Sequence, residues 1–232
     1  MEDQQTNERR FWGRRRGRPL SLLQKSSVNT FSSKLLLPEI EQGFNPKSIF
    51  PNAQAIFCEI GFGNGDFMAD QLKKHPENAY IGIEPFENGF ANFLRRFEDA
   101  QLKDDNIRLH NDDAITLLDK FGDACLDGIY VLNPDPWPKA RHHKRRIVRP
   151  ETVEIYARLL KDGGQLMMTT DVDELAEWMA THAANSPHFK WTAESPEDWK
   201  TPPKDWLATR YEQKGAEAGR SQSYLIFKRK SR

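Results

Sequence analysis

The chain has 232 residues, which is long enough for one full α/β domain with a terminal extension and short for two domains of ordinary size. Apolar residues make up 38% of the chain, which is enough for a core and excludes wholesale disorder. Charged residues make up 29% and cancel to a net charge of zero, so overall charge indicates no class of partner and the local distribution of charge has to be considered instead.

The two cysteines, Cys58 and Cys125, both lie in apolar runs that are typical of strands. Because they form no Cys-x-x-Cys pair, they indicate buried thiols in a reducing compartment rather than a disulfide framework. No run of about 18 apolar residues occurs, and the residues after Met1 are polar and Arg-rich, unlike a signal peptide. We therefore expect a cytoplasmic protein with no membrane segment.

The first 50 residues lack sustained periodicity. Phe11 and Trp12 stand among six arginines, and a Ser/Leu-rich linker follows. We predict an Arg-rich N-terminal arm, partly flexible, over residues 1–50 and a folded domain over residues 51–232. The arginines of the arm are Arg9, Arg10, Arg14, Arg15, Arg16 and Arg18.

From Ala55 onward, short apolar runs alternate with amphipathic stretches. The apolar runs predict buried strands at 55–60, 79–84, 107–110, 126–132 and 164–169. The stretches between them predict helices at 67–74, 87–100, 114–121, 150–160 and 172–184. This alternation predicts a doubly wound α/β sheet. The tail carries three tryptophans in a Pro-rich segment and ends in a further predicted strand at 223–228.

A glycine turn follows the first predicted strand. Gly61, Gly63 and Gly65 occupy alternate positions and lead into a helix. Without a Cβ, each of them lets the backbone turn sharply and approach a ligand closely. The sequence therefore predicts a nucleotide-type ligand at this turn, although a simple tight turn between strand and helix is the structural alternative.

Carboxylates stand where the neighbouring strands end. Glu84 closes the second strand, nineteen residues after Gly65, and can accept hydrogen bonds from both ribose hydroxyls of a nucleoside. Asp113, just past the third strand, is placed to meet an adenine edge. The alternative is that these acids only cap helices.

The spacing of the glycines distinguishes between nucleotide ligands. Dinucleotide sites usually have G-x-G-x-x-G and hold a pyrophosphate at the helix N-terminus, whereas this chain has G-x-G-x-G with Asp66 at that place. Negative charge there repels phosphate and suits a sulfonium or an ammonium group. Glu59, at the end of the first strand, adds a second carboxylate. We therefore predict S-adenosylmethionine rather than NAD as the ligand.

A basic loop follows the fourth predicted strand. Three prolines within five positions fix the backbone and present Asp135 and Trp137 rigidly. From Lys139 to Arg149 there are six lysines and arginines and no acid, which indicates contact with a phosphate backbone, the alternative being a solvated face. Trp137 either stacks on a base or forms a wall of the pocket. His142 and His143 have no further ligands at metal-binding spacing, so we predict no metal.

Residues 133–147 read Asn-Pro-Asp-Pro-Trp-Pro-Lys-Ala-Arg-His-His-Lys-Arg-Arg-Ile and resemble the signature of the bacterial tRNA (guanine-N7)-methyltransferases. The arm resembles that family only loosely, in the Gly-Arg-Pro-Leu stretch at 17–20. Phe62 departs from it, since small residues are commoner there, but the glycines around it remain. From Ala55 on, the resemblance extends over most of the chain and includes the glycine turn, Gly82-Ile83-Glu84, Asp113-Ala114, Thr170-Asp171, Thr209–Glu212, Gly215 and Gly219.

The resemblance implies a Class I methyltransferase domain over residues 51–232, with a Rossmann-like, seven-stranded, mostly parallel sheet whose last strand is antiparallel. It implies methyl transfer from S-adenosylmethionine to guanine N7 in the variable loop of tRNA, with Asp135 as the catalytic residue. The implied cofactor contacts are Glu59, Gly61, Gly63, Gly65, Glu84, Asp113 and Asp135. The implied substrate contacts are Lys139, Asp171, Thr209, Arg210, Tyr211 and Glu212. The implied RNA contacts are Arg141, His142, His143, Lys144, Arg145 and Arg146.

The roles of some residues and the kind of substrate stay open at this point. Asp171 is also in place to be the N-cap of the following helix, and Tyr211 and Glu212 can be plain surface residues. A small-molecule or protein N-methyltransferase, whose Asn-Pro-Pro-Tyr-like loop resembles 133–137, competes as a function, although a small substrate has no need of six cations. A non-catalytic RNA-binding relative competes as well, and an NAD-dependent reductase does so most weakly. The sequence leaves monomer and homodimer open.

Overall fold

The structure is a computed structural model that describes residues 12–204 and 206–232. Arg9, Arg10 and Phe11 of the predicted arm lie outside the described residues. Within these ranges no helix is both long and apolar enough to cross a bilayer.

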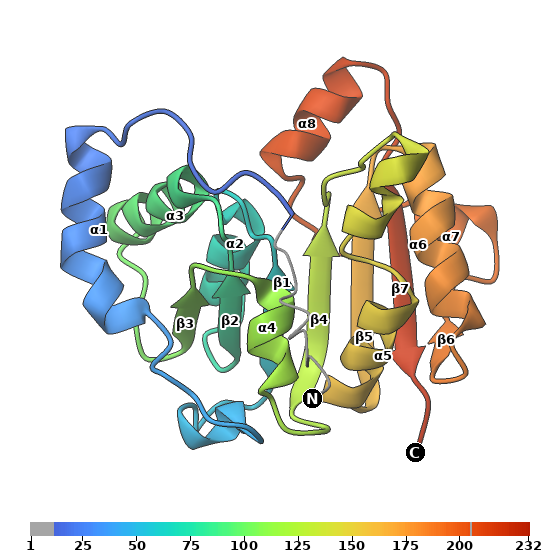
Figure 1. The fold of residues 1–232 in the computed structure, drawn as a ribbon, viewed down its shortest axis with the longest axis horizontal. Helices are drawn as coiled ribbons and strands as arrows, with labels where there is room; N and C mark the ends of the chain where they lie inside the picture. Colours follow the sequence, from blue (N-terminus) through green and yellow to red (C-terminus); the bar gives the residue numbers. More distant parts are fainter. Residues whose placement is uncertain (1–11, 205) are drawn as a thin grey trace, which may run out of the picture.

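A seven-stranded sheet in the order β3-β2-β1-β4-β5-β7-β6 forms the centre of the fold (Figure 1). Strands β1 to β5 pair in parallel, and β7 pairs antiparallel with both β5 and β6. This confirms the predicted doubly wound fold with an antiparallel last strand. The strands are β1 (Ile56–Ile60), β2 (Ala79–Ile83), β3 (Ile107–His110), β4 (Leu126–Leu132), β5 (Leu160–Thr170), β6 (Phe189–Trp191) and β7 (Ser223–Arg229).

The five predicted helices are present as α2 to α6, and three further helices were not predicted. The α-helices are α1 (Leu22–Leu35), α2 (Asp66–Lys74), α3 (Glu87–Asp99), α4 (Ala114–Asp119), α5 (Pro150–Leu159), α6 (Asp173–Asn185), α7 (Pro196–Lys200) and α8 (Arg210–Glu217). Two 3-10 turns, η1 (Pro46–Ser48) and η2 (Ala140–Arg145), complete the description.

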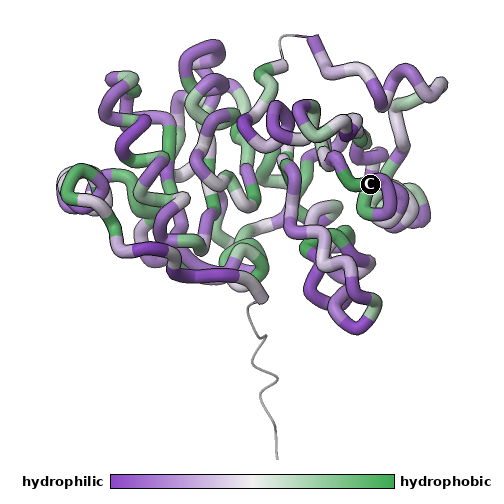
Figure 2. Tube along the Cα trace, turned by 90° about the horizontal axis from the view of Figure 1, so that it is seen from above, coloured by the Kyte–Doolittle hydropathy of each residue, from purple (hydrophilic) through white to green (hydrophobic). Residues whose placement is uncertain are grey.

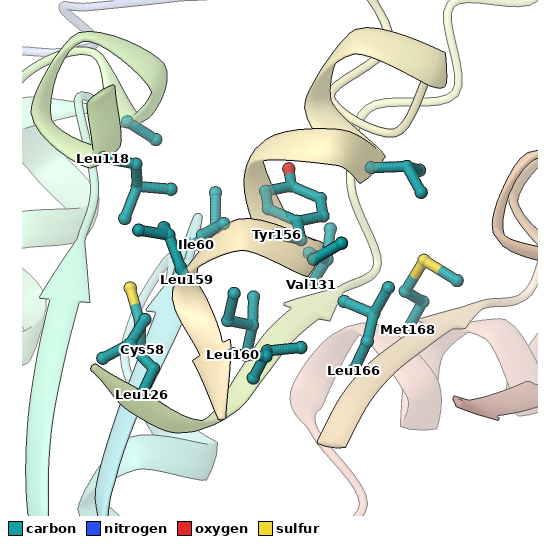
Figure 3. Packing of buried hydrophobic residues seen from close by; sticks show 14 of the residues in the cluster. Cys58, Ile60, Leu118, Leu126, Val131, Tyr156, Leu159, Leu160, Leu166 and Met168 are labelled. Atoms are coloured by element: carbon teal, nitrogen blue, oxygen red, sulfur yellow. The ribbon is translucent and has the colours of Figure 1, made fainter. Parts of the chain in front are cut away.

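Helices cover both faces of the sheet, as the fold requires. Side chains of α4, α5 and α6 share one buried cluster with alternate residues of the central strands, and α1, α2 and α3 form a second cluster on β2 and β3. Tyr156 of α5, which is fully buried, lies over Ile60 and Val131 in the first cluster (Figure 3). Seen from above, hydrophobic stretches of the chain lie mostly inside (Figure 2). Burying one Leu, Ile or Val side chain stabilises the fold by about 1.5–3 kcal/mol. These clusters therefore hold the central strands, and the functional side chains at their ends, in place.

Helix α1 lies in the segment where the sequence predicts a linker. A capping box starts it: the Ser21 hydroxyl accepts from the Gln24 amide nitrogen, and the Gln24 side chain accepts from Ser21 N at 2.8 Å. Leu35 is fully buried, while Leu22 and Leu23 are exposed. Because the leucines do not fall on one stripe, the sequence shows no helical periodicity there.

Candidate active site

A cavity of about 850 Å³ opens at the carboxyl ends of the parallel strands, a volume that suits a nucleoside-sized ligand. It lies where the strand order reverses, between β1 and β4, which is where doubly wound sheets bind ligands. Of the predicted site residues, the cavity brings together Glu59, Gly61, Gly63, Glu84, Asp113, Asp135, Lys144, Arg145, Arg146, Thr209 and Tyr211.

The glycine turn has the backbone conformation that the sequence predicts. Gly61, Gly63 and Gly65 have φ values of 75°, 55° and 68°, a region that residues with a Cβ rarely adopt. A Cβ on Gly65 would lie 2.0 Å from the ring of Phe93, so this glycine serves close packing at the start of α2 and does not line the cavity.

Glu59 is a buried carboxylate at the end of β1. It is 5% exposed, and its Oε2 atom has no hydrogen-bond partner among the described residues. Burial, with smaller contributions from Glu84 and Asp66, raises the pKa of Glu59 to about 8. An unpaired buried carboxyl oxygen in a ligand-sized cavity is costly unless a ligand cation or donor meets it.

Glu84 shapes the glycine turn as well as lining the cavity. Its carboxylate accepts hydrogen bonds from Gly63 N at 2.6 Å and from Phe86 N at 2.8 Å. Burial raises the pKa of Glu84, and these two backbone donors oppose that effect. The side chain is therefore held in one orientation.

Asp113 and Asp66, two further acids that line the cavity, have partners within the protein. Asp113 is the N-cap of α4, where its side chain accepts a hydrogen bond from Thr116 N at 2.8 Å. It also lines the cavity, so it both caps the helix and lies in the predicted pocket. Asp66 forms an ion pair of 2.5 Å with Arg96. That pairing offsets the negative charge expected of Asp66 at the start of α2, which leaves Glu59 to meet a cationic ligand at the end of β1.

The loop after β4 holds Asp135 at the mouth of the cavity. Asn133 and Trp137 have φ values of 48° and 44°, a left-handed conformation that asparagine tolerates and that is strained for a bulky residue such as tryptophan. The Asp135 side chain accepts no hydrogen bond from any residue that the structure describes, and desolvation by the pocket walls raises its pKa. Its carboxylate is therefore free for a ligand.

Arg146 has a different place from the one expected for an RNA contact. It is 1% exposed and its guanidinium forms two hydrogen bonds with Glu174 of α6, at 2.9 and 2.5 Å. Its Nε donates to the carbonyl of Pro136 at 2.9 Å, and the group lies over the ring of Trp178. A buried side chain with these partners ties the basic loop to α6, so Arg146 is an anchor of the loop rather than part of the surface open to RNA.

We expect Arg146→Ala to lower the free energy of unfolding by about 2–4 kcal/mol, because it empties a packed site and leaves the Pro136 carbonyl without its donor. Urea denaturation measures the change. The exposed neighbour Lys144 is the matched control, and Lys144→Ala should stay within about 0.5 kcal/mol of the parent. Equal stability of Arg146→Ala and the parent would contradict the anchoring role.

Three other cations of the basic loop are exposed to solvent. Lys139, Arg141 and Lys144 are exposed, while the His143 ring packs against Trp178 at a centroid distance of 5.1 Å and His142 lies edge-on to Trp137 at 5.9 Å. No group of three metal-binding side chains occurs within the described part of the chain.

The predicted substrate segment forms the start of α8, which stands above the carboxyl end of β4 (Figure 1). Thr209 and Glu212 make a capping box, and Glu212 also accepts from the Trp206 indole at 2.9 Å and from the hydroxyl of Tyr224. Tyr211 is 62% exposed and lines the cavity, whereas Arg210 lines a neighbouring hollow.

Asp171 is not the N-cap of α6, since that helix begins at Asp173 with Val172 as its cap. It pairs instead with Arg220 at 2.8 Å and lies against Gly215, where a Cβ would come within 2.6 Å of its carboxylate. Asp171 therefore secures α8 to the carboxyl end of β5 and does not line the cavity.

The arm supplies pocket residues that are absent from the predicted site. Trp12, Gly13 and Arg14 line the cavity, and the Arg14 guanidinium lies 5.7 Å from the ring centre of Phe86. The arginine run that marks the arm is the only sequence signal for this contact, and it does not indicate where the arm lies.

Comparison with known proteins identifies the class first. Residues 53–225 match the family described as "Putative methyltransferase". The solved structure of the 16S rRNA methyltransferase KamB shares the fold, with a TM-score of 0.55 and 10% identity over 84% of this chain and 98% of that one. The family match makes the chain a methyltransferase, and the likeness to that structure shows the shared fold.

Curated relatives then give the particular family. The tRNA (guanine-N(7)-)-methyltransferase of Rhodospirillum rubrum is 39% identical over 100% of this chain and 92% of its own length. That of Agrobacterium fabrum is 40% identical over 97% of this chain and 100% of its own length. The chain belongs to the tRNA (guanine-N7)-methyltransferase family, as the signature after β4 predicts.

Proposed function

We propose that the protein transfers a methyl group from S-adenosylmethionine to N7 of a guanine in the variable loop of tRNA, giving 7-methylguanosine. The observation that carries the proposal is one cavity that is lined both by the buried Glu59, whose Oε2 has no hydrogen-bond partner among the described residues, and by Asp135 and Lys144 of the loop after β4. Relatives with this activity in their names are 38–41% identical to the chain, which supports the same reaction here.

The residues of the cavity fit S-adenosylmethionine. Glu59 offers a carboxyl oxygen to the ammonium group of the methionine end, and the glycine turn leaves room for close approach. The Glu84 carboxylate, which two backbone amides hold, has further lone pairs that can accept from ribose hydroxyls. Asp113 lines the part of the pocket expected for adenine. When bound, this donor supplies a sulfonium methyl group, which the lone pair of N7 takes up while the carbon–sulfur electron pair stays on sulfur.

The site needs no general base for this reaction. Guanine N7 carries a lone pair and no proton, so the protein has to hold N7 in line with the methyl group and to stabilise the positive charge that the purine gains. Asp135, which has no hydrogen-bond donor among the described residues and stands between two prolines, can do both by accepting hydrogen bonds from guanine N1 and N2. We assign it as the catalytic residue.

The exposed cations favour RNA over a small molecule as the substrate. Lys139 and Arg141 are exposed in the segment that follows Asp135 and Trp137 of the cavity, and no acid occurs between Lys139 and Arg149 to neutralise them. Such cations gain affinity from phosphates by releasing counterions, and a small methyl acceptor offers no comparable charge.

We expect Lys139→Ala combined with Arg141→Ala to reduce the slope of log K against log salt for tRNA binding by about 1.5, because each phosphate contact contributes about 0.7–0.9. Filter binding over a series of salt concentrations measures the slope. Lys103→Ala with Lys228→Ala is the matched control, since both lysines are exposed and neither lines the cavity. An unchanged slope in the first pair would contradict the phosphate contacts.

The proposed function is tested with labelled S-adenosylmethionine and unmodified tRNA, followed by chemical cleavage at 7-methylguanosine. We expect one cleavage position, in the variable loop. Methyl incorporation at another atom would contradict the assignment, and tRNA binding without any incorporation would favour the non-catalytic relative.

A further inference from the structure

We propose that Trp12 and Trp137 form an aromatic clamp that stacks on the target guanine, favours the positively charged methylated purine, and is occupied in this structure by the guanidinium of Arg145. The inference rests on the proposed function and adds Trp12, from the N-terminal arm, to the substrate site. It also gives Arg145 two alternative positions.

The contacts of Arg145 locate the clamp. Its guanidinium carbon lies 4.6 Å from the ring centre of Trp12 and 4.9 Å from that of Trp137, within the range of cation–π attraction. Its Nε atom is buried without a hydrogen-bond partner among the described residues. Both indoles and Asp135 line the same cavity. A planar cation is thus held mainly by aromatic faces, at the place where the substrate base has to enter.

The backbone positions both tryptophans, Trp137 in the loop after β4 and Trp12 in the N-terminal arm. Trp137 stands between Pro136 and Pro138 with φ of 44°, so its backbone has little freedom to change. Trp12 continues into a stretch of arm that lies on the start of α3: Glu87 N donates to the carbonyl of Arg15 at 2.9 Å. The two rings therefore come from segments far apart in the sequence to one pocket mouth.

The arm is seated closely at this place. The Asn88 side chain donates to the Arg18 carbonyl at 2.8 Å, and a Cβ on Gly17 would lie 2.3 Å from Asn88 Oδ1. A side chain at position 17 would displace the Asn88 side chain, whose amide holds the Arg18 carbonyl. The glycine therefore allows the approach that brings Trp12 over the cavity.

The chemistry of the reaction explains why such a clamp suits this site. Aromatic faces attract cations, and transfer of a methyl group to N7 moves one positive charge onto the purine ring. A site that holds a guanidinium over two indole faces should therefore bind 7-methylguanosine more tightly than guanosine. When the base takes this place, the Arg145 guanidinium is displaced and becomes available to a phosphate of the RNA.

The test measures nucleoside binding by calorimetry with S-adenosylhomocysteine present, at slightly acidic pH where 7-methylguanosine keeps its charge. We expect the parent to prefer 7-methylguanosine over guanosine by about fivefold or more. Trp12→Ala should weaken 7-methylguanosine binding about tenfold, and Trp12→Phe should restore it to within about threefold. Trp199→Ala is the matched control, since Trp199 also carries a cation, Lys200, over its ring but lies outside the cavity.

Arg145→Ala tests the occupancy with an effect of opposite sign. It should raise nucleoside affinity at least twofold, because the clamp no longer has to be vacated, while it weakens tRNA binding. No gain in nucleoside affinity would overturn the occupancy, and equal binding of the two nucleosides would overturn the charge preference. If the parent methylates tRNA but Trp12→Ala binds nucleosides and methylates tRNA as well as the parent does, the clamp is refuted and the proposed function stands. If the parent transfers no methyl group to N7, the proposed function itself is refuted.

Discussion

Asp135→Ala is expected to lower kcat/KM for tRNA methylation by about 100- to 1000-fold, the size typical of removing one preorganised group that stabilises transition-state charge. The loss should fall on kcat, because the carboxylate meets the charge that the purine gains only as the methyl group is transferred. A single-turnover assay with labelled methyl donor measures it.

The same variant should fold normally, which makes the result informative. No residue in the described part of the chain donates a hydrogen bond to Asp135, so its removal leaves no buried partner unsatisfied. Its urea midpoint should match that of the parent. Asp105→Ala, at an exposed aspartate in the loop before β3, is the control and should keep full activity. Activity within tenfold of the parent in Asp135→Ala would exclude the catalytic role.

Glu59→Gln is expected to weaken S-adenosylmethionine binding about 10- to 100-fold, the size of a lost charged hydrogen bond of about 1.5–3 kcal/mol. The parent's affinity should rise with pH and level off above about 8, since a cationic ligand selects the ionised carboxylate and Glu59 has its pKa raised to about 8 by burial. Calorimetry in buffers of different ionisation enthalpy should detect proton release at neutral pH. The variant should show neither effect.

Although Glu59→Gln should weaken ligand binding, it should make the ligand-free protein more stable. A carboxyl group whose folded pKa is raised from 4.5 to about 8 holds its proton in the folded protein after the unfolded chain has lost it, so its contribution to stability falls as pH rises through that window. Glutamine has no proton to lose, and at pH values near the top of the window it should stabilise the ligand-free protein by about 1–3 kcal/mol. Glu39→Gln, at an exposed position, should change neither binding nor stability. Parent-like affinity in Glu59→Gln would mean that another group holds the ammonium end.

The parts of the site that depend on strand ends could be predicted from the sequence. Glu59, Glu84, Asp113 and Asp135 each lie at or just after the end of an apolar run, and parallel strands bring their carboxyl ends to one edge. The short strand β6 could not be predicted, because three residues carry no periodicity.

Contacts made across long sequence separations could not be predicted in this way. A run of cations does not indicate which one turns inward, and the burial of Arg146 depends on Glu174 and Trp178 of α6. Likewise, the contact between Asp171 and Gly215 depends on α8 lying against the carboxyl end of β5, which the sequence does not indicate. The family signature marks such residues without separating those that contact a ligand from those that hold the loop in place.

The burial of Leu35 limits how many N-terminal residues can be removed from the protein. This residue of α1 is enclosed by the same cluster as Phe93 and Phe97 of α3, so a chain begun at residue 51, where composition changes, would leave those rings open to water. The smallest expression product with an intact hydrophobic interior begins ahead of Ser21, which caps that helix. Deletions meant to isolate the catalytic unit should therefore keep α1.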